Sequence, residues 1–147
     1  NDPTELGQIS NKIGKALADF LAKKIYNAVY THNYEDAMVQ HGYPIVGSRP
    51  DLYCDALTAQ FAVEAKGYKV SSISTNKMIR YKEQSQVGPV PVHFSVASVS
   101  YDIYEQPKVK FYEPVSSDVE YSEEINQRLC SNYYQSILAM IKYLGKL

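Results

Sequence analysis

Two short apolar runs joined by a turn, each with charged residues at one end, restrict the fold of this chain more than any other feature. The first run follows Asp51, and the second, residues 61–63, leads directly into Glu64 and Lys66, with a turn at about residues 55–58 between them. Apolar runs of this length bounded by turn residues are typical of buried strands. The sequence therefore predicts two adjacent strands whose charged residues lie at one end.

Charged side chains are expected to gather where these strands meet. Glu64 and Lys66 are two residues apart, so on a strand their side chains point to one face, about 6.6 Å apart along it, while Ala65 points into the core. If Asp51 begins a neighbouring antiparallel strand, two carboxylates and one ammonium group meet at one edge of the sheet. Adjacent carboxylates repel each other, and a divalent cation relieves that repulsion. Oxygen ligands suit Mg²⁺ or Mn²⁺, so the set provides the groups needed for phosphodiester hydrolysis.

At these residues the sequence resembles the PD-(D/E)xK nuclease superfamily. Residues 50–51, Pro-Asp, match the first half of the family motif, and residues 64–66, Glu-Ala-Lys, match the second half, with 12 residues between the two acids. At the level of topology the resemblance covers about residues 9–114. It implies a restriction-endonuclease-like fold and metal-dependent cleavage of nucleic acid.

The resemblance also implies a role for each motif residue. Asp51 and Glu64 bind Mg²⁺ or Mn²⁺, the backbone carbonyl of Ala65 is a further ligand, and Lys66 positions or activates the attacking water. Taken singly, the two halves of the motif have ordinary interpretations, because Glu-x-Lys is common on exposed strands as a weak ion pair and Asp after Pro is common in turns. The two halves together, in this order, favour the nuclease site.

The remaining sequence predicts an α/β protein in which all residues, 1–147, form a single domain. We expect a restriction-endonuclease-like central mixed β-sheet of about five strands, flanked by helices. Hydrophobic periodicity and breaker residues place helices at residues 9–29, 71–86 and 123–144, and strands at residues 37–40, 92–101 and 108–112 in addition to the two motif strands. Ser10 or Asn11 is expected to cap the first helix and Ser74 or Thr75 the second, in which Ile79 is expected to face inward.

In the resembling family the first helix often contributes a further acidic ligand to the metal. Asp19 in that helix is one candidate, and Glu35 and Asp36 in the following segment, residues 31–36, which is predicted to be a loop, are others. An exposed acidic side chain is the alternative for all three.

The segment that begins at the proposed site is basic. Residues 66–110 contain seven Lys or Arg against three Asp or Glu, a balance of +4, whereas the net charge of the chain is −1. The overall charge argues against nonspecific coating of nucleic acid, but the local excess favours a phosphate-binding face. A solvated helix face is the alternative. The candidates for nucleic-acid contact are Lys69, Lys77, Arg80, Tyr81 and Gln84, together with Tyr68, whose ring can stack on a base.

The sequence leaves several functional classes open. No apolar run is long enough for a membrane span. The absence of an initiator methionine suggests an excised or processed domain, although removal of a tag gives the same result. The chain looks like the nuclease toxin domain of a bacterial polymorphic or contact-dependent toxin, which a cognate immunity protein inhibits. A restriction or repair nuclease, a catalytically silent nucleic-acid-binding module and a purely structural domain are the alternatives. DNA is the favoured substrate, with tRNA or other RNA as the alternative.

Overall fold

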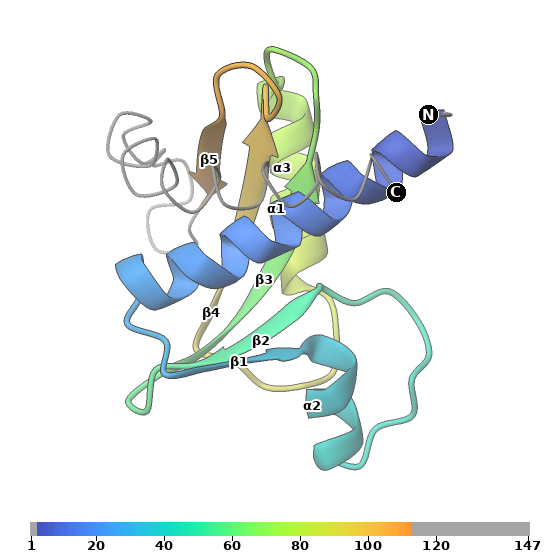
Figure 1. Cartoon of the computed structure of the whole chain (residues 1–147). Coiled ribbons are helices and arrows are strands. Elements are labelled where there is room, and N and C mark those ends of the chain that lie inside the picture. Colours follow the sequence, from blue (N-terminus) through green and yellow to red (C-terminus); the bar gives the residue numbers. More distant parts are fainter. Residues whose placement is uncertain (1–2, 113–147) are drawn as a thin grey trace, which may run out of the picture.

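Five strands form one mixed sheet in the computed structural model, which describes residues 3–112 (Figure 1). In chain order the elements are α1 (Pro3–Ile25), β1 (Tyr30–Asn33), α2 (Tyr34–Gln40), β2 (Leu52–Asp55), β3 (Gln60–Gly67), α3 (Thr75–Gln86), β4 (Phe94–Tyr101) and β5 (Lys108–Tyr112). The sheet order is β1-β2-β3-β4-β5, with β3 and β4 parallel and the other neighbours antiparallel. The predicted α/β class with a five-stranded mixed sheet is confirmed, whereas the helix predicted at residues 123–144 lies outside the described residues.

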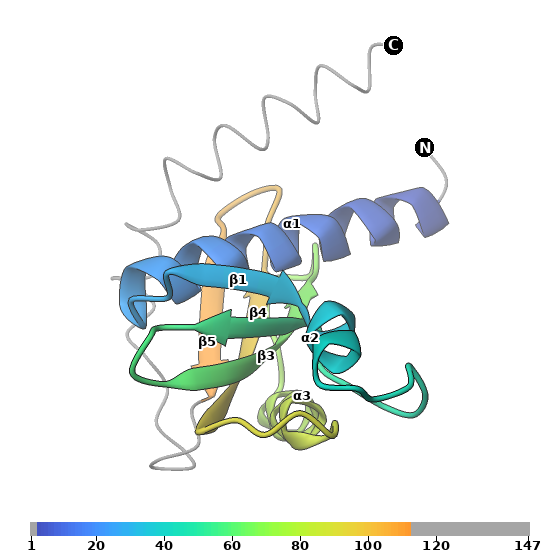
Figure 2. The same cartoon turned by 90° about the horizontal axis from the view of Figure 1, so that it is seen from below.

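Helices cover both faces of the sheet (Figure 2). α1 crosses one face, where Leu17 belongs to the same apolar cluster as Phe61 and Val63 of β3. α2 and α3 lie on the opposite face, each with an apolar cluster of its own. Because side chains alternate along a strand, Ala62 and Glu64 face α2 and α3. None of the helices within residues 3–112 has the length and apolar character that crossing a membrane requires.

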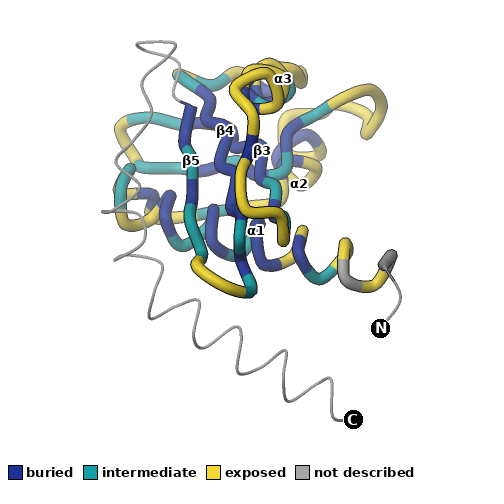
Figure 3. The backbone as a smooth tube through the Cα atoms, turned by 90° about the horizontal axis from the view of Figure 1, so that it is seen from above, coloured by how far each residue is buried: buried dark blue, intermediate teal, exposed yellow. Residues whose placement is uncertain are grey.

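β3 and β4 form the centre of the sheet and are its most buried strands (Figure 3). Every residue of β4 from Ser95 to Tyr101 is buried. A parallel strand covered by helices on both faces reads as a continuous buried run rather than an alternating one. The strands predicted at residues 92–101 and 108–112 are therefore confirmed as β4 and β5, and β5 lies at an edge of the described sheet, as its lysines indicate.

The strand predicted at residues 37–40 is wrong, because these residues belong to α2. The first strand is β1, which begins one residue before the predicted loop at residues 31–36 and includes the first residues of that loop. Two acidic residues in the first turn of α2 suit the positive end of a helix. The buried residues of α2 recur at a spacing of three and four, which belongs to a helix and not to a strand: Tyr34, Ala37 and Met38.

α1 begins and ends earlier than predicted. It starts at Pro3, so that Ser10, expected as a cap, lies inside the helix. It stops at Ile25, and Asn27 has a φ of 59°, a left-handed conformation that ends a helix. Val29, the last residue of the predicted helix, is consequently outside α1 and 48% exposed.

α3 confirms its predicted cap but not its predicted inner face. The Ser74 hydroxyl accepts a hydrogen bond from the backbone N–H of Lys77 at 3.2 Å. Ile79, predicted to face inward, is 43% exposed. Met78 and Lys82 are buried instead, because they lie four residues apart on the face that packs against the sheet.

Candidate active site

Asp51 is fixed at the start of β2 by backbone contacts to β3. Its N–H donates to the Val63 carbonyl at 3.0 Å, and its side-chain Oδ2 accepts the N–H of Ala65 at 2.8 Å. β2 pairs with β3 in antiparallel orientation from Leu52 onward. The paired residues of β2 begin at Leu52, and the Asp51 carboxylate accepts the Ala65 N–H just beyond them. The antiparallel arrangement expected around Asp51 is therefore present.

The carboxyl groups of Asp51 and Glu64 are in hydrogen-bonding contact. The Glu64 side chain is only 6% exposed. Burial, followed by the hydrogen bond with Asp51 and the negative charge of Asp51, raises the pKa of Glu64 to about 9, while the positive charge of Lys66 opposes this shift. At neutral pH the Glu64 carboxyl group of the metal-free protein therefore holds a proton.

Lys66 completes the group on the same face of β3. Its Nζ is 3.9 Å from Glu64 Oε2 and 5.7 Å from the centre of the Tyr81 ring. The Tyr81 hydroxyl in turn shares a short hydrogen bond with the Tyr68 hydroxyl. Ala65 lies between the two charged residues and is buried in the cluster under α1, as the two-residue period of a strand predicts.

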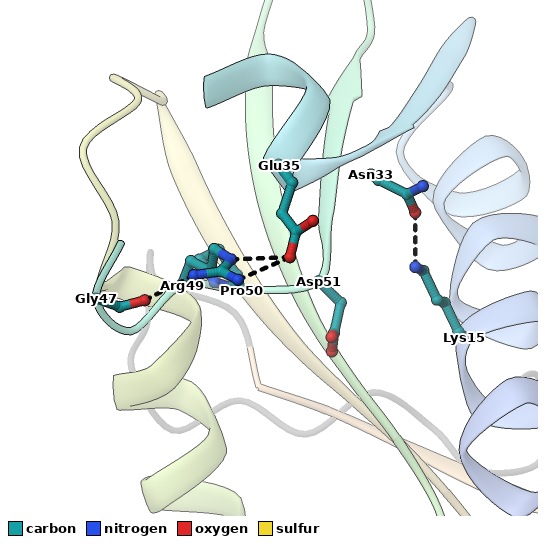
Figure 4. Close-up of a pocket in the computed structure, with 7 residues that line it drawn as sticks. All are labelled: Lys15, Asn33, Glu35, Gly47, Arg49, Pro50 and Asp51. Atoms are coloured by element: carbon teal, nitrogen blue, oxygen red, sulfur yellow. Dashed lines mark hydrogen bonds and ion pairs between the residues drawn. The ribbon is translucent and has the colours of Figure 1, made fainter. Parts of the chain in front are cut away.

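A cleft of about 440 Å³ reaches this group from the Asp51 side (Figure 4). Glu64 and Lys66 are not among the residues that line it. Besides Asp51, the lining residues come from α1, β1, α2 and the loop before β2, and they are Lys15, Asn33, Glu35, Gly47, Arg49 and Pro50. Of these only Glu35, as a candidate acid, and Pro50, in the motif, were singled out by sequence. The position of Arg49 beside Pro-Asp was a usable signal, whereas nothing in the sequence pointed to Lys15.

The residues predicted to contact nucleic acid lie at different distances from this group. Tyr81 is beside Lys66, and Gln84 donates to the Arg49 carbonyl at 3.0 Å, which holds the loop before β2 against α3. Lys77 lies over the Tyr68 ring at 5.4 Å, farther along the same helix. Lys69 and Arg80 are exposed, and neither lines the cleft.

The three candidate acids outside the motif differ in position. Glu35 lies in the cleft and binds Arg49 at 2.8 Å. Asp19 pairs with Lys23 at 3.3 Å and accepts a hydrogen bond from Thr31 at 2.5 Å. Asp36 is exposed and lines a neighbouring hollow.

No family model matches the sequence, and no curated protein or solved structure matches it either. The functional interpretation accordingly depends on the geometry and chemistry of the site.

The donor set fits a hard divalent cation that retains water ligands. Within residues 3–112 no group of three or more His, Cys, Asp or Glu side chains is placed to hold a metal. Asp51 and Glu64 provide two neighbouring carboxylates, and a cation can replace the proton held by Glu64. Because the N–H and C=O of one strand residue point to the same side, the Ala65 carbonyl faces the Asp51 side as its N–H does. Mg²⁺ typically binds through one or two carboxylates and keeps several waters, so this small set suffices.

Proposed function

We propose that this chain is a metal-dependent endonuclease that hydrolyses phosphodiester bonds of nucleic acid, with DNA favoured over RNA, on a restriction-endonuclease-like fold. The observation that supports this proposal most strongly is the contact between Asp51 and the buried Glu64, with the Lys66 ammonium 3.9 Å from Glu64. Burying the Glu64 carboxyl group beside a second carboxyl group costs folding free energy. A functional role explains why this cost is tolerated at the end of an otherwise apolar strand.

In this proposal Asp51, Glu64 and the Ala65 carbonyl hold Mg²⁺ or Mn²⁺. When bound, the cation supplies a Lewis acid that activates water and neutralises charge on the phosphate. The net reaction adds water across one P–O ester bond, leaving a phosphate monoester and a free hydroxyl. Lys66 positions the water by donating hydrogen bonds and stabilises the negative charge that develops on the phosphate oxygens.

A second candidate is a nucleic-acid-binding module that does not hydrolyse its ligand. One observation favours it, which is that the described residues offer only two clustered carboxylates and no third acidic side chain for a metal. A module of this kind has no need for the Asp51–Glu64 contact, so we place it second.

The decisive experiment is cleavage of plasmid DNA and total tRNA by the purified protein with Mg²⁺, with Mn²⁺ and with EDTA. Glu64→Gln and Lys66→Met remove the proposed chemistry with little change in volume, and Glu83→Gln, an exposed residue of α3, is the matched control. We expect metal-dependent cutting that falls roughly a hundredfold or more in the first two variants and is unchanged in the control. If neither polymer is cut and titration calorimetry detects no metal binding, the nuclease proposal is wrong and the binding module is favoured.

The proposed biological setting, a toxin domain blocked by an immunity protein, follows from the resemblance alone. It predicts that expression of the active domain stops bacterial growth and that expression of Glu64→Gln does not. Equal growth with both proteins, in cells shown to contain active nuclease, would favour a restriction or repair role.

A further inference from the structure

Two cationic side chains in the cleft beside Asp51 have no role in the proposed hydrolysis. Lys15 comes from α1, and Arg49 comes from the loop before β2. Figure 4 shows them on opposite sides of Asp51, Arg49 with Glu35 and Lys15 with Asn33. Two cations from separate elements therefore line the same cleft as a proposed catalytic carboxylate.

Arg49 is held in one orientation and keeps donors for a ligand. Its Nε and Nη2 donate to Glu35 Oε1 at 3.1 and 2.8 Å, and its Nη1 donates to the Gly47 carbonyl at 2.9 Å. A guanidinium group has five N–H donors, so these three bonds leave two of them, one on each terminal nitrogen, for a ligand. A guanidinium fixed in this way is preorganised to bind a phosphate oxygen.

Lys15 is oriented by a neutral partner, so its charge is not cancelled. Its Nζ donates to the Asn33 side-chain oxygen at 2.6 Å. Among the described residues no carboxylate lies within ion-pair distance of Lys15. Asp19, one helical turn along α1, pairs with Lys23 instead and accepts a hydrogen bond from Thr31. An amide partner fixes the position of the ammonium group and leaves its full charge and two of its donors for an anion.

A second hollow of about 460 Å³ lies beside the cleft and shares Lys15 and Asn33 with it. The second hollow is also lined by Lys12, which lies three residues before Lys15 on the same side of α1, and by Asp19 and Asp36, of which Asp19 is already paired with Lys23. A path along the two neighbouring hollows thus leads from Arg49, past Asp51, to Lys15 and Lys12. An extended ligand with regularly spaced negative charges fits such a path better than a compact one.

We infer that Arg49 and Lys15 bind the backbone phosphates on either side of the phosphate that is cut at Asp51, so that one nucleic-acid strand crosses the cleft from the loop before β2 to α1. This inference rests on the proposed nuclease function. It assigns substrate binding to the face between α1 and the loop, whereas the basic segment of residues 66–110 had been the expected location.

The test is binding of a short fluorescein-labelled single-stranded DNA, measured by fluorescence anisotropy over a series of salt concentrations. Ca²⁺ replaces Mg²⁺ in one series and EDTA is present in another, so that binding is measured without cleavage. The variants are Lys15→Gln, Arg49→Gln and Arg49→Lys. Lys24→Gln is the matched control, because Lys24 is an exposed lysine of α1 that lines neither hollow.

We expect Lys15→Gln and Arg49→Gln each to weaken binding about tenfold at low salt, since a hydrogen-bonded charge pair is lost. Each should also reduce the slope of log affinity against log salt by about one, as loss of one phosphate contact requires. The affinity of Arg49→Lys should lie between those of the wild type and Arg49→Gln, because lysine keeps the positive charge but lacks the planar guanidinium group and its fixed set of donors. Lys24→Gln should match the wild type.

The outcomes separate this inference from the proposed function. Wild-type protein that cuts DNA, with both glutamine variants binding as tightly and with the same salt slope, overturns the inference alone. Binding that is lost in both variants, together with a wild type that cuts nothing, supports phosphate binding by Arg49 and Lys15 and overturns the proposed hydrolysis. Absence of any binding and cutting by the wild type overturns both. Melting temperatures equal to that of the wild type show that the variants are folded. Lys15 lies on the helix surface, so Lys15→Gln tests the inference even if Arg49→Gln disturbs the loop before β2.

Discussion

The carboxylate of Asp51 accepts a hydrogen bond of 2.8 Å from the backbone N–H of Ala65, the residue between Glu64 and Lys66. One side chain therefore links the start of β2 to the part of β3 that carries the other charged groups. The spacing of Asp51 from Glu64 and Lys66 is set by the backbone and does not depend on a bound ligand. Asp51 has a structural task in addition to its proposed role as a metal ligand.

These two tasks can be separated by mutation. Asp51→Asn keeps an acceptor for the Ala65 N–H and removes the negative charge, so we expect activity to fall roughly a hundredfold or more while the free energy of unfolding changes by less than about 1 kcal/mol. Asp51→Ala removes both and should also destabilise the protein by about 1–2 kcal/mol, because a backbone donor loses its partner. Urea denaturation and cleavage rates measure the two effects, with Glu83→Gln as the control. Equal stability of the two variants would show that the hydrogen bond contributes nothing.

The raised pKa of Glu64 predicts a specific pH dependence of stability. Its value of 4.5 in the unfolded chain rises to about 9 in the folded, metal-free protein. Between these values the folded state holds a proton that the unfolded state has released, so the free energy of unfolding falls as pH rises, by at most about 1.4 kcal/mol per pH unit. Urea denaturation in EDTA between about pH 5 and pH 8 measures this slope. Glu64→Gln, which cannot titrate, should show a flatter profile, and an identical slope in both proteins would contradict the assignment.

The same proton should compete with a metal ion. A cation that binds Asp51 and Glu64 must displace the proton of Glu64, so its apparent affinity should increase with pH up to about 9. We expect the rise in melting temperature caused by Mn²⁺ to be larger at pH 8 than at pH 6, by an amount equivalent to roughly a tenfold gain in affinity per pH unit. Glu64→Gln should show little rise at either pH. A rise that is independent of pH would place the metal elsewhere.

The sequence predicted the centre of the site better than its surroundings. The two-residue period of a strand was enough to place Glu64 and Lys66 on one face and Ala65 on the other, and the turn at residues 55–58 implied the antiparallel pair. The strand predicted at residues 37–40 was wrong, because four residues are too few to distinguish strand from helix by periodicity. β1 was not predicted because it is largely exposed and lacks alternation, and its pairing with β2 determines its conformation.

The cleft depends on tertiary contacts that no local pattern encodes. Lys15 reaches it only because α1 crosses the sheet and Asn33 lies at the end of β1. Lys82 shows the opposite error, since it was counted in the basic segment but is buried and donates to the Ser95 carbonyl at 2.7 Å. Charge counts along the chain cannot distinguish a lysine that faces a ligand from one that satisfies a buried carbonyl.

The Tyr81 ring is predicted to position Lys66. A cation 5.7 Å from a ring centre gains about 0.5–1 kcal/mol at a partly exposed site, so Tyr81→Leu should lower kcat two- to fivefold. Tyr81→Phe keeps the ring and loses only the hydroxyl that contacts Tyr68, so its kcat should remain within about twofold of the wild type. Multiple-turnover cleavage at saturating substrate measures kcat, and Tyr30→Leu, which changes an exposed tyrosine of β1, is the control. If Tyr81→Phe and Tyr81→Leu change kcat equally, the ring does not act on Lys66.

Gly67, next to Lys66, should be the least replaceable glycine of the described chain, because α1 rests directly on the end of β3. A methyl group at Gly67 would overlap the Ser10 carbonyl of α1, and one at Gly14 would lie 2.5 Å from the Lys66 carbonyl. We expect Gly67→Ala to push the helix off the strand, destabilise the protein by about 3 kcal/mol or more and reduce cleavage through displacement of Lys66. Gly7→Ala, on the same helix with no atom within 4 Å of the added methyl, should instead be neutral or stabilise by up to about 1 kcal/mol. Urea denaturation of both variants measures the difference, and a Gly67→Ala protein as stable as Gly7→Ala would show that α1 does not lie against β3 at this point.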